Sequence, residues 1–173
     1  MPFSVSIVGR SNSGKTTLLE KVVGELKQRG YRLATIKHSA HDFELDHPGK
    51  DSWRHAKAGS DTVVVSSPRK MALIKRVARD TSLPELLHLI GSDFDFVLVE
   101  GFKNSSLPKI EVHRKGKGEL LCSEEELLGV VTDEPLSVSV PQFTPDEVRP
   151  LVDLLEQGFL AWRRADDVVR GQA

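Results

Sequence analysis

Residues 9–16 read Gly9-Arg10-Ser11-Asn12-Ser13-Gly14-Lys15-Thr16, and they match the phosphate-binding pattern G-x-x-x-x-G-K-[ST] at every fixed position. Residues 3–8 alternate aromatic or aliphatic side chains with serine and predict a short buried strand. From Lys15 onward, apolar side chains recur at helical spacing as far as Gly30 and predict a helix. The order of strand, glycine loop and helix is the context in which this pattern indicates a phosphate site.

The residue types of the loop suit a nucleotide triphosphate. Backbone amides must point inward around phosphates, and Gly9 and Gly14 permit the tight turns that this requires. Lys15 adds a full positive charge near the β and γ phosphates, and the Thr16 hydroxyl is placed to ligate Mg²⁺. A chance glycine-serine turn is the alternative, but such a match is rare in a chain of this length. We therefore predict that the nucleotide is held by Gly9, Asn12, Ser13, Gly14, Lys15, Thr16 and Thr17.

Composition bounds the class of protein. At 173 residues the chain suits one domain, residues 1–173, with a core over about residues 3–160 and a tail at 165–173 that frays. With 24 basic and 25 acidic residues, the balance of charge gives no sign of a nucleic-acid partner. The single cysteine, Cys122, fits a reducing compartment. No secretory signal and no run of about 20 apolar residues is evident, so we expect a cytoplasmic protein without a membrane partner.

The order of the remaining elements predicts an α/β fold. A second strand over residues 31–37 completes a strand-helix-strand unit, which implies a right-handed parallel crossover. Residues 61–66 and 71–74 suggest an antiparallel hairpin, residues 109–114 a half-buried strand, and residues 128–132 another strand. A helix opens at Thr144 and runs to about Arg164. We expect a P-loop NTPase: a mainly parallel twisted sheet flanked by helices, with an antiparallel hairpin or edge element.

A polar loop, residues 38–52, follows the second strand. Parallel sheets place ligands at the carboxyl ends of their strands, so this loop is a candidate switch facing the γ-phosphate. Lys37 and His38 are candidate phosphate or partner contacts, and the loop acids Asp42 and Asp46 could orient the attacking water.

Two later strands end in acids. Glu100 follows the apolar run of residues 96–99 and resembles a Walker B acid that reaches Mg²⁺, although a buried strand with an acidic end gives the same pattern. Asp133, after Thr132, could read the N1 and N2 donors of guanine, since a carboxylate accepts two hydrogen bonds in parallel. A solvated turn acid is an equally good interpretation of Asp133.

A set of motifs is together more specific than the phosphate loop alone. They are Ser13-Gly14-Lys15-Thr16-Thr17-Leu18-Leu19, Ile36-Lys37-His38, His41-Asp42-Phe43, Asp46, Pro48-Gly49-Lys50-Asp51-Ser52, Lys57-Ala58-Gly59 and Leu98-Val99-Glu100-Gly101-Phe102-Lys103. With these motifs, roughly residues 3–160 resemble the MobB family, the molybdopterin-guanine dinucleotide biosynthesis adapter proteins.

The resemblance implies a GTP-binding P-loop protein with weak GTPase activity. It further implies a homodimer that assists a MobA-type guanylyltransferase in the last step of bacterial molybdenum cofactor synthesis, with the pterin cofactor as a further candidate ligand. On matching positions, Gly14, Lys15, Thr16 and Thr17 would hold phosphates and Mg²⁺, and Glu100 would be the Walker B acid. No Asn-Lys-x-Asp motif follows that strand, so guanine preference depends on the resemblance and on Thr132 and Asp133.

Two other classes of P-loop protein stay open. A metal-insertion GTPase of nickel-enzyme maturation suits Glu100 but needs a thiolate or histidine site, and the one close histidine cluster is His38 and His41 with His47 nearby. A small-molecule kinase needs an arginine-rich lid, which the sequence does not suggest. No arginine finger is identifiable either, and Arg10 is only a candidate.

Overall fold

The computed structural model describes residues 2–170. Residues 39–85 form one compact unit, and the described residues on either side of them form another. The two units are defined only by how densely each packs within itself, which does not decide the number of folding domains. Our expectation of one domain therefore stays a prediction.

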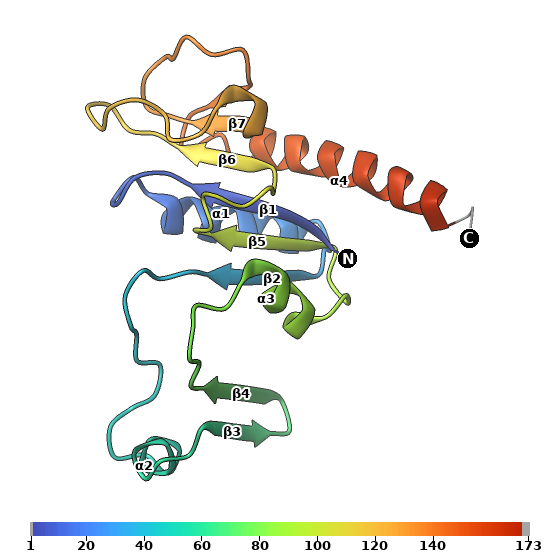
Figure 1. The fold of residues 1–173 in the computed structure, drawn as a ribbon. Coiled ribbons are helices and arrows are strands. Elements are labelled where there is room, and N and C mark those ends of the chain that lie inside the picture. The colour runs from blue at the N-terminus through green and yellow to red at the C-terminus, as the bar shows by residue number, and fades with distance from the viewer. Residues whose placement is uncertain (1, 171–173) are drawn as a thin grey trace. The chain divides into compact units, whose positions relative to one another are not determined.

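The first unit is built on a parallel sheet of six strands in the order β2-β5-β1-β6-β7-β8 (Figure 1). The strands are β1 (Phe3–Val8), β2 (Leu33–Lys37), β5 (Phe96–Glu100), β6 (Lys109–Val112), β7 (Leu127–Val131) and β8 (Gln142–Phe143). Every neighbouring pair is parallel, which confirms the predicted sheet. Because β1 lies between β5 and β6, the carboxyl ends of these three strands meet at one edge, and the phosphate motif lies at that edge.

Helices complete the first unit. They are α1 (Lys15–Gln28), α3 (Leu83–Ile90), which begins at the end of the second unit, α4 (Val148–Arg170) and the short 3-10 helix η1 (Glu124–Glu126). α1 and α4 share one apolar core with the sheet, in which Val22, Leu26 and Leu155 are fully buried. Among residues 2–170, no helix is both long enough and apolar enough to cross a membrane.

α4 differs from its predicted bounds at both ends. It begins at Val148, because Thr144 and Glu147 instead form a turn in which the Thr144 amide donates to Glu147 Oε2 at 2.7 Å. It continues past Arg164 to Arg170, and residues 165–170 contain no glycine or proline that would end the helix earlier. The expectation that residues 165–173 fray stays a prediction, and residues 171–173 lie outside the described ones.

β6 is fully buried, although its alternating sequence predicted a half-buried strand. Lys109 Nζ donates to the Ser105 carbonyl at 2.7 Å and to Glu126 at 2.8 Å. Glu111 accepts hydrogen bonds from the backbone amides of Leu121 at 2.7 Å and Cys122 at 3.0 Å. These hydrogen-bond partners lie outside the strand, so the alternation of polar and apolar residues along β6 could not predict that its polar side chains are buried. Burial, with Glu111 close by, raises the pKa of the Cys122 thiol to about 11, so this thiol stays protonated at neutral pH.

The second unit contains α2 (Asp51–Lys57), β3 (Thr62–Ser67) and β4 (Lys70–Lys75). β3 and β4 form the expected antiparallel hairpin, as a two-stranded sheet of their own. Its turn is closed by Ser67, whose hydroxyl exchanges hydrogen bonds of 3.1 Å with the backbone of Lys70. The hairpin is largely exposed, with Val63 its one buried residue.

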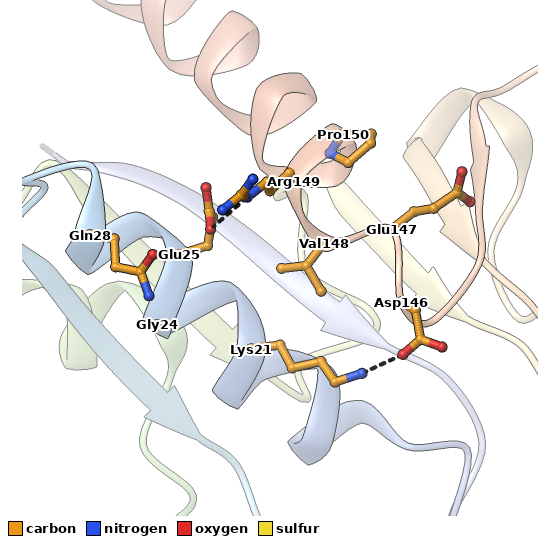
Figure 2. A pocket seen from close by; sticks show the side chains of 9 residues that line it. All are labelled: Lys21, Gly24, Glu25, Gln28, Asp146, Glu147, Val148, Arg149 and Pro150. Carbon is orange, nitrogen blue, oxygen red and sulfur yellow. Dashed lines mark hydrogen bonds and ion pairs between the residues drawn. The ribbon is translucent and has the colours of Figure 1, made fainter.

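Arg29, just after α1, ties this helix to α4. Its guanidinium donates to Glu25 at 2.9 Å and to Asp153 and Glu156 at 2.6 Å each. These bonds, first the one to Asp153, raise the pKa of Arg29 above its ordinary value. Nearby, Lys21 pairs with Asp146 at 2.8 Å, but both side chains are well exposed (Figure 2). The Arg29 contacts therefore join α1 to α4 through a largely buried guanidinium, whereas the Lys21 contact joins α1 to an exposed residue of the turn before α4.

We predict that Arg29→Ala lowers the free energy of unfolding by about 2 kcal/mol, because it leaves three carboxylates together without their common cation. Lys21→Ala is the matched control and should change it by less than about 0.5 kcal/mol, since exposed pairs contribute little. Urea denaturation of both variants measures the difference. Equal losses would show that Arg29 does not fasten α4 to α1.

Candidate functional site

The phosphate loop connects β1 to α1 in a conformation that needs its glycines. Gly9 has φ 141°, and a Cβ on it would lie 2.4 Å from the Val112 carbonyl oxygen. Gly14 has φ 96° and caps α1, and Asn12 also lies in the left-handed region at φ 59°. Such a succession of turns directs backbone amides to one side, as anion binding requires. The loop therefore has the backbone that the sequence predicted.

The Lys15 side chain folds back and hydrogen-bonds to the phosphate loop. Its Nζ donates to the carbonyl oxygens of Gly9 at 3.0 Å and Arg10 at 2.8 Å. Burial lowers the pKa of Lys15, the Glu100 carboxylate opposes this effect, and the positive charge of Lys37 adds to it. Lys15 thus belongs to one electrostatic cluster with Glu100 and Lys37.

Glu100 is the centre of this cluster. The Thr16 hydroxyl donates to its two carboxylate oxygens at 3.2 and 3.1 Å, and Lys37 Nζ pairs with Oε1. The parallel registers explain the meeting, because Glu100 lies opposite Ile7 of β1 and opposite Lys37 of β2. The Glu100 side chain is only 4% exposed, whereas that of Lys37 is 60% exposed. A hydroxyl and a carboxylate side by side are hard oxygen donors of the kind that Mg²⁺ prefers, so these residues fit the predicted metal.

His38 lies beside the same acid. Its backbone amide donates to the Glu100 carbonyl at 2.9 Å, and its ring packs on Phe102 at 4.5 Å between centroids. Gly101 has φ 111°, and a Cβ on it would come within 3.0 Å of the His38 Cβ. The end of β2 is therefore fixed against the end of β5, which places Lys37 and His38 at the site.

The other loop side chains differ in exposure. Ser13 is 1% exposed, and within residues 2–170 its hydroxyl has no hydrogen-bond partner. Thr17 is exposed at the start of α1. Arg10, the candidate arginine finger, donates to the Glu119 carbonyl at 3.3 Å. The loop residues are thus brought together, and their contacts with a nucleotide stay predictions.

Thr132 and Asp133 follow β7 at the same edge of the sheet. The Thr132 hydroxyl donates to the Glu134 carbonyl at 2.9 Å and accepts from the Glu134 amide at 3.2 Å. Asp133 Oδ1 accepts a hydrogen bond from the Lys115 amide at 2.8 Å, and Oδ2 lies 3.6 Å from Arg114 Nη1. The Lys115 amide is the first cause of a lowered pKa of Asp133. Both carboxylate oxygens already have partners, and the reading of guanine by Asp133 stays a prediction.

Arg114 is the residue that sequence reasoning missed. Its Nε donates to the Ser13 carbonyl at 2.9 Å, and its Nη2 lies 2.9 Å from the place that a Cβ on Gly14 would take. The sequence presents Arg114 as the last residue of an alternating strand, just before a charged glycine turn, where it looks like a solvated side chain. Its position near the carboxyl end of a strand that neighbours β1 is the one signal that could have found it.

Asp42 and Asp46, the candidates for orienting water, belong to the second unit. Asp42 is exposed, and Asp46 Oδ1 accepts from the His47 amide at 2.9 Å. Their catalytic roles stay predictions. Over the described part of the chain, no group of three or more His, Cys, Asp or Glu side chains is arranged to hold a metal ion.

Comparison with known proteins adds a family to this geometry. A family model described as molybdopterin guanine dinucleotide synthesis protein B matches residues 4–133. A molybdopterin-guanine dinucleotide biosynthesis adapter protein of Haemophilus influenzae is 38% identical over 154 residues, 88% of this chain and 86% of the relative. The protein of the same description from Escherichia coli K12 is 37% identical, over 84% and 86% of the two chains. A crystal structure of molybdopterin-guanine biosynthesis protein B superposes with a TM-score of 0.70 at 32% identity, covering 89% and 98%.

Proposed function

The chain belongs to the MobB family of molybdopterin guanine dinucleotide synthesis proteins, and from this premise we propose that it is a GTP-binding adapter with weak GTPase activity. Its partner would be a MobA-type guanylyltransferase that forms molybdopterin guanine dinucleotide. The two relatives at 37–38% identity are themselves described as adapter proteins of this biosynthesis. The transferase reaction would belong to the partner.

The observation that carries the proposal is the cluster of Lys15, Thr16, Lys37 and Glu100 beside the phosphate loop. Backbone amides of the loop and the Lys15 ammonium would hold the phosphates. The Thr16 hydroxyl and the Glu100 carboxylate would hold Mg²⁺, which supplies neutralising charge when bound. These are the groups that P-loop NTPases need, and three strands position them.

Slow hydrolysis would follow from what the site contains. Phosphoryl transfer depends on a positioned water and on cations that neutralise the developing charge. Arg10, the candidate arginine finger, donates a hydrogen bond to the Glu119 carbonyl, and Arg114 donates one to the Ser13 carbonyl of the loop. Both arginines are therefore engaged within the protein. GTP hydrolysis that is slow until a partner binds suits an adapter, because the protein then stays in its GTP-bound state long enough to meet that partner.

The exposed surface of the second unit supports the homodimer. Apolar side chains of its loop and hairpin are between 47% and 77% exposed, and these are Phe43, Leu45, Val64, Val65, Met71, Leu73 and Val77. So many exposed apolar residues in one small unit are typical of a surface that another chain covers. A second copy is the occupant that the family resemblance implies.

The test is calorimetric titration of the purified protein with GTP and with ATP in the presence of Mg²⁺. We expect GTP to bind at least about tenfold more tightly than ATP, since an acceptor that pairs with guanine leaves adenine unpaired. Addition of a MobA-type guanylyltransferase should change this affinity or the slow turnover. Equal binding of the two nucleotides without an effect of the partner would overturn the adapter proposal. Rapid transfer to a small acceptor would instead indicate a kinase.

A further inference from the structure

We propose that Arg114 is a positioning residue of the phosphate loop and that Asp133 acts through it, so that the end of β7 controls how tightly the loop holds phosphate. This inference rests on the proposed nucleotide site but assigns two residues a task that neither the loop motif nor base recognition gives them. The chain of contacts runs from Asp133 to Arg114 and on to the peptide between Ser13 and Gly14.

The first step is the bond between Arg114 Nε and the Ser13 carbonyl, 2.9 Å long. This carbonyl and the Gly14 amide belong to one planar trans peptide, so they point in opposite directions. Fixing the oxygen on the outside of the loop therefore fixes the Gly14 N–H toward the inside, where phosphate binds. A charged donor also polarises that peptide and strengthens the N–H as a donor in turn.

The second step is the fit of the guanidinium against the loop. Arg114 Nη2 lies 2.9 Å from the place of a Cβ on Gly14, so the side chain packs directly beside this turn. The Arg114 side chain is 28% exposed. A lysine at this position would lack the planar fork and the second nitrogen, so it could not make the same contact.

The third step is how Arg114 is held. Asp133 Oδ1 binds the amide of Lys115, the residue that follows Arg114, while Asp133 Oδ2 lies 3.6 Å from the guanidinium. One carboxylate thus holds both the backbone and the side chain. The parallel pairing of Val112 with Val131 and the 2.8 Å bond from the His113 amide to the Val131 carbonyl bring the two strand ends together.

The experiment uses calorimetry with GTP, ATP and inorganic tripolyphosphate on the full chain. Arg114→Ala should weaken the binding of all three probes about tenfold or more. Added guanidinium ions should restore much of the affinity of Arg114→Ala, with sodium chloride at equal ionic strength as the comparison. A general structural role for Arg114 would not give this rescue. Lys117→Ala, which removes the same charge from the same exposed turn, should leave all affinities unchanged.

Asp133→Asn separates the two tasks of the acid. We expect it to weaken GTP, ATP and tripolyphosphate, and the loss common to all three measures its action through Arg114. A further loss for GTP alone measures guanine reading, and a loss for GTP with tripolyphosphate unchanged would overturn the role of Asp133 in this inference. Unchanged phosphate affinity in Arg114→Ala, or no rescue by guanidinium, would overturn the inference. If Arg114→Ala does not fold, Arg114→Lys must show the same uniform weakening. A wild-type protein that binds tripolyphosphate but does not prefer GTP would refute the proposed function and leave this inference testable.

Discussion

Lys15→Ala is expected to weaken GTP binding by about a hundredfold or more. The ammonium lies against the loop, where it can turn from the Gly9 and Arg10 carbonyls to the β and γ phosphates. A charge-assisted contact with a polyanion at a partly buried site contributes far more than one in open water. Titration calorimetry with GTP in the presence of Mg²⁺ measures the effect.

Two controls make the Lys15 result specific. Lys21→Ala removes the same charge from an exposed position on the same helix and should leave the GTP affinity within about twofold of wild type. Thermal unfolding should show that Lys15→Ala is folded, since it removes only two hydrogen bonds within the loop. A folded Lys15→Ala that binds GTP as tightly as wild type would mean that residues 9–16 are not a phosphate site.

The parts of the site that sequence predicted are those whose geometry is local. The loop motif and its flanking elements depend on consecutive backbone conformations, so Gly9, Gly14 and Thr16 could be placed without knowledge of the fold. Glu100 could be placed too, because an acid at the end of a buried strand in such a fold has few other locations.

Contacts between residues on different strands could not be predicted from the sequence. The pairing of Lys37 with Glu100 depends on β5 lying between β1 and β2, and the contact of Arg114 with Ser13 depends on β6 lying on the other side of β1. The two-residue strand β8 has no periodicity of its own to recognise. Strand order arises from the packing of the whole sheet, which periodicity along one segment does not specify.

Glu100→Gln should remove most of the Mg²⁺ dependence of GTP binding and lower GTP hydrolysis by about a hundredfold. The amide keeps the size of the side chain but loses the charge that both Lys37 and a divalent cation require. The side chain is 4% exposed, and its partners in this structure are the Thr16 hydroxyl and the Lys37 ammonium. GTP affinity measured over a range of Mg²⁺ concentrations is the direct readout.

Lys37 provides a second test of the metal site, because its ammonium pairs with Glu100 Oε1, an oxygen that a divalent cation would also bind. If the two cations compete for Glu100, then Lys37→Gln should reach half-maximal GTP binding at a lower Mg²⁺ concentration than wild type, while Glu100→Gln should show almost no such dependence. The two variants change charge in opposite directions at one contact, so a general disturbance of the fold would not separate them. A Mg²⁺ requirement that is identical in wild type and Glu100→Gln would remove Glu100 from the metal site, and the Walker B assignment would have to pass to another acid.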